Sequence, residues 1–126
     1  MGIACIFSLV VSCNKTVVEP KIHEVTLEQL IDDAEQYNGK LVQVSGFASM
    51  GFENCIFFPH NPEVKAVAEE YWVWYREKAV GCGAGVYAKK TKYGNAEIKG
   101  RFDWDDKGHL GAFSASINDA EIIWVK

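Results

Sequence analysis

The sequence predicts a mainly β domain with short helices: a small barrel of five to six strands preceded by an N-terminal helix. The first observation is a run from Asn95 to Ile117 in which apolar and polar residues alternate, the period-two pattern of half-buried strands. The second is a similar alternation from Lys40 to Met50, with glycines at which a strand bends sharply. The third is size, because 126 residues with a 48% hydrophobic share fit one domain around one core.

The N-terminal residues are expected to serve export rather than folding. Residues 1–12 form an uncharged apolar run, too short to span a bilayer, that ends in Val10-Val11-Ser12 directly before Cys13. This arrangement resembles the end of a bacterial lipoprotein signal peptide, which implies that Cys13 is lipidated and becomes the mature N-terminus. The basic residues expected before such a run are missing, so either the true start lies upstream or the signal is atypical. The alternative is that the run forms a hydrophobic first strand of the domain.

Residues 13–24 are predicted to be the lipidated N-terminus and a tether, followed by a single domain at residues 25–126. The segment from Asn14 to Lys21 is polar and turn-prone, and His23 is expected to be solvated within the tether. The lipoprotein resemblance implies an extracytoplasmic protein held at a membrane, in the periplasm or cell envelope. Asn14 after the lipidated cysteine is compatible with sorting to the outer membrane of a Gram-negative bacterium.

The domain is predicted to open with one helix. Thr26 and Gln29 fit a capping box, and Asn38-Gly39 supplies a left-handed stop. The apolar stripe between them comprises Leu27, Leu30, Ile31, Ala34 and Tyr37. Lys40 to Met50 then forms the first barrel strand, with Gly46 as a point where the strand curls.

The middle of the chain is predicted to hold two further strands and a short helix. Residues 53–58 form the second strand, which Pro59 ends, and a helix begins at Asn61-Pro62-Glu63. Its inner face is expected to comprise Val64, Val67 and Ala68. The aromatic and branched run from Tyr71 to Tyr75 is the third strand.

The chain is predicted to end in a β-hairpin and a closing strand. An irregular strand from Val80 to Ala88 and a polar loop at 89–94 lead into the two arms, residues 95–104 and 112–117. The residues that favour turns between the arms are Asp105, Asp106, Gly108 and Gly111. Asn118-Asp119 interrupts the pattern, and Ala120 to Val125 resumes as a closing strand.

Two stretches of the chain carry a family resemblance. One is Tyr37-Asn38-Gly39-Lys40 followed by Leu41-Val42-Gln43-Val44-Ser45-Gly46; the other is the hairpin from Gly100-Arg101-Phe102 to Gly108-His109-Leu110-Gly111-Ala112-Phe113-Ser114. Together they resemble small, largely uncharacterised exported bacterial lipoproteins with OB-type barrels, which implies an OB-like fold. Neither stretch is catalytic, and residues 51–94 depart from the pattern, so the family supplies no site residues.

An aromatic set is the first candidate site. OB barrels bind oligonucleotides or oligosaccharides on an open sheet face where rings stack. A ligand face is therefore sought around Trp72, Trp74 and Tyr75, with Tyr71 and Trp104 nearby. The alternative is that these rings fill or cover the barrel. The formal net charge of −4 gives no attraction to a polyanion, so nucleic acid is disfavoured as a partner.

Cys55 and Cys82 are the only thiols left in the mature chain beside Cys13. Disulfides persist in oxidising compartments, so a Cys55–Cys82 bond is one possibility. The other is a pair of small buried thiols.

Two further sets hold residue types found in metal or catalytic sites. Asp103, Asp105 and Asp106 with His109 suggest a calcium loop, but Asp and Gly also form hairpin turns. The other set is Cys55, Cys82, His60 and His109, whose spacing matches no zinc pattern. We therefore expect no catalytic residue, no metal and no cofactor.

The leading hypothesis is a lipid-anchored extracytoplasmic domain that binds an unidentified protein or small envelope ligand and catalyses nothing. One alternative is an oligosaccharide or single-stranded nucleic-acid binder that uses the aromatic face. The other is a thiol- or metal-dependent enzyme.

Overall fold

The computed structural model describes residues 20–51, 54–78, 80–82 and 91–126. The predicted signal at 1–12, the lipidation residue Cys13 and most of the predicted irregular strand lie outside the described residues. The described elements, in chain order, are β2 (His23–Glu24), α1 (Leu27–Asp32), α2 (Ala34–Tyr37), β3 (Leu41–Met50), β4 (Ile56–Phe58), the 3₁₀ helix η1 (Glu69–Tyr71), β5 (Val73–Glu77), β6 (Lys92–Asp103), the 3₁₀ helix η3 (His109–Gly111) and β7 (Ser116–Trp124).

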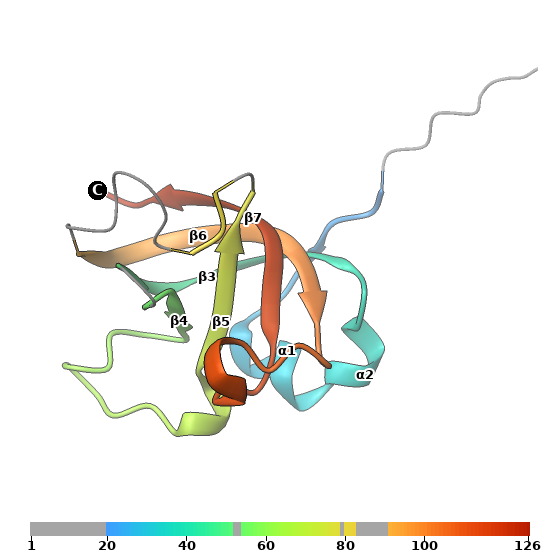
Figure 1. The fold of residues 1–126 in the computed structure, drawn as a ribbon, viewed down its shortest axis with the longest axis horizontal. Helices are drawn as coiled ribbons and strands as arrows, with labels where there is room; N and C mark the ends of the chain where they lie inside the picture. Colours follow the sequence, from blue (N-terminus) through green and yellow to red (C-terminus); the bar gives the residue numbers. More distant parts are fainter. Residues whose placement is uncertain (1–19, 52–53, 79, 83–90) are drawn as a thin grey trace, which may run out of the picture.

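Five strands form a closed mixed barrel in the order β3-β4-β5-β7-β6, and β6 pairs with β3 to complete it. The closing β3–β6 ladder is antiparallel along all of β3, from Leu41 opposite Arg101 to Met50 opposite Lys92. β5 and β7 are parallel, and the other barrel pairs are antiparallel. β2 adds a short parallel strand to β3, and α1 and α2 lie against one end of the barrel (Figure 1). The predicted fold class, a mainly β protein with a small OB-like barrel, is confirmed.

The N-terminal helix begins as predicted but is divided in two. The Thr26 hydroxyl accepts the Gln29 N–H at 3.0 Å, and the Gln29 side chain accepts the Thr26 N–H at 2.9 Å, so the capping box is confirmed. Asp33 leaves the helical region with φ −116° and ψ 40° and separates α1 from α2. The predicted apolar stripe is therefore carried by two short helices.

His23 is not solvated in a tether, which corrects the prediction. It pairs in parallel with Val42 of β3, and its ring meets Tyr37 edge-on at 5.8 Å between centroids. The polar composition of this segment hid the pairing, because a two-residue strand leaves no alternating pattern to recognise. The folded domain therefore begins two residues before the predicted boundary at Val25.

Gly46 marks the point where β3 changes its neighbour along one edge. Before it, Val42 and Gln43 pair with β2, and after it, Phe47 to Ser49 pair with β4. A Cβ atom on Gly46 would lie 2.3 Å from the Phe58 carbonyl oxygen. The structure thus requires glycine here because β4 approaches closely, while the predicted curl at Gly46 stays a prediction.

The predicted helix at Asn61 is wrong. The Asn61 carbonyl accepts N–H groups from Val64 and Lys65, which makes one isolated turn, and the helical turn comes later as η1. Val64, placed on the inner face by the prediction, is 83% exposed. A single helical turn orders several residues for few hydrogen bonds, so capping signals alone do not sustain a helix without a buried face.

The predicted hairpin is confirmed, with a longer connection and a longer second arm. β6 and β7 pair from Asp103 opposite Ser116 to Ala96 opposite Trp124. Asn118-Asp119 forms an irregularity within β7, where Asp119 has a φ of 51°, instead of separating two strands. The predicted closing strand is thus the second half of β7, and residues 104–115 form the connection, which we call the covering loop.

Candidate functional site

The covering loop lies over Trp74 of β5, on part of the face on which OB-type barrels bind their ligands. That face is the outer side of the second and third barrel strands, here β4 and β5. Trp74 of β5 projects outward, since it stands opposite Ile56 while its neighbour Val73 stands opposite the core residue Phe57. Its indole nevertheless packs under the loop, 5.5 Å from the stacked ring of His109 and 5.1 Å from Phe113.

Gly108 brings the loop into contact with Trp74. A Cβ atom on Gly108 would lie 2.6 Å from the Trp74 Cβ, and its φ of 73° belongs to the left-handed region that favours glycine. Trp74 is left 3% exposed, and its Nε1 is the single buried side-chain nitrogen or oxygen of the described residues without a hydrogen-bond partner. Close packing of the indole thus outweighs a polar cost on the order of 1–3 kcal/mol.

Two of the three rings of the predicted ligand face, Trp74 and Tyr75, are buried and offer no stacking surface. Tyr75 is fully buried, and its hydroxyl donates to the Ser49 carbonyl at 2.8 Å; burial, with a smaller effect of Glu77, raises its pKa. Trp72 is half-buried, meets Phe58 edge-on at 5.8 Å and donates its Nε1–H to the Val67 carbonyl at 3.1 Å. Trp74 and Tyr75 thus fill or cover the barrel, as the alternative interpretation expects, while Trp72 stays half-buried.

The aspartates of the covering loop act as turn and anchoring residues. Asp103 accepts the Asp105 N–H at 3.0 Å. The Asp106 carboxylate accepts the Gly108 N–H at 3.0 Å, pairs with Arg76 at 2.5 Å and accepts from Asn118 at 3.2 Å. The prediction that these residues serve the turn is confirmed. No group of three or more potential ligand side chains from His, Cys, Asp or Glu is found within the described ranges.

The environment of Asp106 also favours its ionised form. Partial burial alone would raise the pKa of this carboxyl. The Gly108 N–H, Arg76 and Asn118 outweigh that effect and lower the pKa below its ordinary value. Arg76 lies in β5 and Asn118 in β7, so the ionised carboxylate fastens the loop to two barrel strands.

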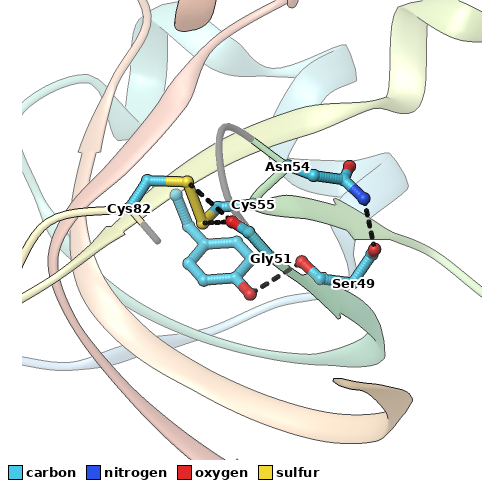
Figure 2. Close-up of a disulfide and its surroundings, with 6 residues drawn as sticks. Ser49, Gly51, Asn54, Cys55 and Cys82 are labelled. Atoms are coloured by element: carbon cyan, nitrogen blue, oxygen red, sulfur yellow. Dashed lines mark hydrogen bonds between the residues drawn. A yellow bond between two sulfur atoms is a disulfide. The ribbon is translucent and has the colours of Figure 1, made fainter. Parts of the chain in front are cut away.

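Cys55 and Cys82 form a disulfide, with a Cα–Cα distance of 5.8 Å (Figure 2). The possibility of a bond is therefore confirmed over that of two thiols. The Gly51 carbonyl oxygen lies 3.7 and 3.8 Å from the two sulfurs, contacts that are not hydrogen bonds because bonded sulfurs carry no hydrogen. His60 is engaged elsewhere, with its Nε2 3.1 Å from the Lys65 carbonyl.

The outer face of β3 and β6 offers a different candidate site. Its residues line a series of neighbouring hollows: Gln43, Ser45, Phe47 and Ser49 from β3, and Tyr93, Asn95, Glu97 and Lys99 from β6. We call this surface the open face. It contains Tyr93, which is 63% exposed, and it borders the exposed Ile123 of β7.

One hollow of the open face combines aromatic and polar side chains. It has a volume of about 260 Å³ and is lined by Phe47, Ser49, Asn54, Phe58, Asn61, Pro62, Glu63 and Tyr93. We call it the aromatic pocket. A wider hollow of about 470 Å³ beside α1 and α2 is lined by acidic residues and Trp104. The Lys107 Nζ lies over the Trp104 ring, 3.8 Å from its centroid. The aromatic pocket is the better candidate because several rings and uncharged polar groups converge there.

The sequence patterns do not reveal this pocket. Phe47 falls on the outward side of β3, beside the polar residues Gln43 and Ser45, and a large aromatic residue at an outward position was the available signal. Tyr93 was assigned to a polar loop, whereas β6 begins at Lys92 and places Tyr93 opposite Ser49.

Comparisons of the chain with protein-family models, curated proteins and solved structures find no match. Within the described residues, no helix is both long and apolar enough to cross a membrane.

Proposed function

We propose that this protein is a lipid-anchored, extracytoplasmic binding domain without catalytic activity, and that its ligand binds on the open face. The observation that carries the proposal is the contrast in exposure between the two aromatic surfaces. The chain's own loop covers Trp74, while Tyr93 and the hollows beside it are accessible.

The disulfide supports the extracytoplasmic part of the proposal, because such bonds persist in oxidising compartments and are rare in the cytosol. The residues before Cys13 that resemble a lipoprotein signal support the anchor. The same bond argues against a thiol enzyme, since neither Cys55 nor Cys82 is then a nucleophilic thiolate.

The charge of the open face supports a ligand other than nucleic acid. Glu97 and Glu63 line its hollows, and Lys99 is paired with Glu121 at 3.7 Å. The formal net charge is −4. A surface that binds phosphates would instead present several unpaired cations.

The anchor is tested by the intact mass of the protein purified from the membrane fraction of a bacterial host. We expect a chain that begins at Cys13 and carries acyl groups, with two thiols appearing only after reduction. A full-length, unacylated chain would contradict the anchor.

The binding face is tested by photo-crosslinking in living cells. A photoreactive amino acid at Asn95, an exposed position on the open face, should give a light-dependent adduct. The matched position is Lys78, exposed just after β5, which should give none. Equal adducts at both positions, or none at either, would contradict the proposed face.

A further inference from the structure

We infer that the aromatic pocket is a carbohydrate-binding site that takes one uncharged sugar ring of an oligosaccharide. This inference rests on the proposed function, because it names the ligand class of the same open face. It also moves the predicted oligosaccharide site away from Trp74, which the covering loop covers.

The floor of the pocket is aromatic and rigid. Phe47 and Phe58 stand opposite each other in the β3–β4 ladder, and each is 8% exposed. Phe58 is supported by the edge of Trp72, whose indole is fixed by its hydrogen bond to Val67. Tyr93 lies 6.2 Å from Phe47 at a tilt of 41° and extends the floor into an exposed ring. The exposed ring of Tyr93 is the surface that would pack against the C–H face of a sugar, and the buried rings behind it hold it in place, which reduces the entropy lost on binding.

The rim supplies hydrogen-bonding groups whose orientation is already set. The Asn54 amide nitrogen donates to the Ser49 hydroxyl at 3.2 Å, so its carbonyl oxygen lies on the side of the amide away from Ser49 (Figure 2). The Asn61 side-chain oxygen accepts the Glu63 N–H at 2.9 Å, which leaves the amide hydrogens of Asn61 as donors. Amide donors and acceptors around an aromatic floor match the alternating hydroxyl groups of a sugar ring.

The charge and the volume of the pocket restrict the class of ligand further. Among the described residues, Glu63 is the one charged side chain that lines the pocket, and its carboxylate disfavours anionic ligands such as uronic acids or phosphates. The volume of about 260 Å³ is below that of drug-sized sites and suits a single ring. A second hollow of about 400 Å³, lined by Ser45, His60 and Asn95, shares Asn61 with the pocket and gives room for the next ring of a chain.

The test is calorimetric titration of the full chain with uncharged hexasaccharides of glucose and N-acetylglucosamine. We expect at least one to bind with a Kd below about 1 mM. Tyr93→Ala should weaken binding about tenfold, while Tyr93→Phe should keep it within about twofold. Leu110→Ala is the control, because Leu110 is an exposed apolar residue, 88% accessible, that lies on the covering loop and lines none of the open-face hollows, and it should bind like the wild type.

Three outcomes would overturn the inference. In the first, no hexasaccharide binds, and in the second, Tyr93→Ala binds as well as the wild type. In the third, a tryptophan-containing peptide binds with higher affinity than the sugar and displaces it, which would make the ligand of the pocket a peptide. The proposed function fails separately. If no sugar binds but the Asn95 crosslink forms, the open face is still a binding face and only its ligand class is wrong. If neither is seen, both proposals fail.

Discussion

Trp74 and Tyr93 occupy comparable places in the barrel, yet one is buried and the other is exposed. Both project outward from a barrel strand, and they are 3% and 63% exposed. The difference comes from residues 104–115, which cover Trp74 with His109, Phe113 and the Gly108 backbone. Strand alternation therefore predicts the side on which a residue projects, but not whether a distant segment covers that side.

Replacing Trp74 should have the strongest effect on stability and tests its contrast with Tyr93 most directly. Trp74→Ala should destabilise the protein by about 3–5 kcal/mol, because it opens a cavity under the covering loop. Tyr93→Ala should change the free energy of unfolding by less than about 0.5 kcal/mol, as for other exposed sites. Urea unfolding followed by circular dichroism measures both, and Trp74→Phe keeps a ring in case the alanine variant does not fold. Similar losses at the two sites would show that the faces do not differ as described.

Removing the disulfide tests whether the open face and the covered Trp74 region are independent. The bond lies beside the open face, since Cys55 is next in sequence to the pocket residue Asn54. Closing a chain segment with a sequence separation of 27 should contribute about 3 kcal/mol. In the double variant Cys55→Ala/Cys82→Ala, the free energy of unfolding should be lower by about that amount. The difference in native fluorescence between this variant and the same variant carrying Trp74→Phe isolates Trp74 from the other three tryptophans. That Trp74 emission should match the emission isolated in the same way from the wild type, and a red shift would contradict the separation of the two regions.

The smallest expected effect is the pH dependence of the covering loop. The pKa of Asp106 is lowered on folding from its ordinary value of 3.8, so its stabilisation is present above that value. It is lost as the pH falls through the lower folded value. We expect Asp106→Asn to cost about 1 kcal/mol at pH 7, since Arg76 is 38% exposed and solvent screens the pair, and to cost less near pH 3.

A matched variant on the open face serves as the control for this pH effect. The Lys99–Glu121 pair is longer, at 3.7 Å, and more exposed, so Glu121→Gln should change stability by less than about 0.5 kcal/mol at either pH. Thermal unfolding across this pH range measures both variants. An equal pH dependence in the two would remove Asp106 as the anchor of the loop.

The candidate site was harder to predict than the fold because it combines residues from separate elements. Phe47 and Ser49 come from β3, Phe58 from β4 and Tyr93 from β6, with Asn54 and Asn61 on either side of β4. Taken alone, each of these residues is accounted for by its position in a strand or a turn. Their chemistry as a group appears only when the β3–β6 ladder closes the barrel and places Tyr93 opposite Ser49.

Features that depend on residues close together in the chain could be predicted from the sequence. These are the capping box at Thr26, the alternating strand from Leu41 to Met50, the hairpin turn at Asp103 to Gly108 and the barrel class. Each follows from local hydrogen bonding or from side-chain periodicity, which a short window of residues specifies.

Features that depend on residues far apart in the chain could not be predicted and required the complete fold. It brought Cys55 to Cys82, placed His23 beside Val42, and laid residues 104–115 over Trp74 while leaving Tyr93 exposed. The physical reason is that burial is a property of the whole fold. The hydrophobic effect favours removing any apolar ring from water, but which rings are covered depends on where loop lengths and anchors such as Arg76–Asp106 allow the chain to pass.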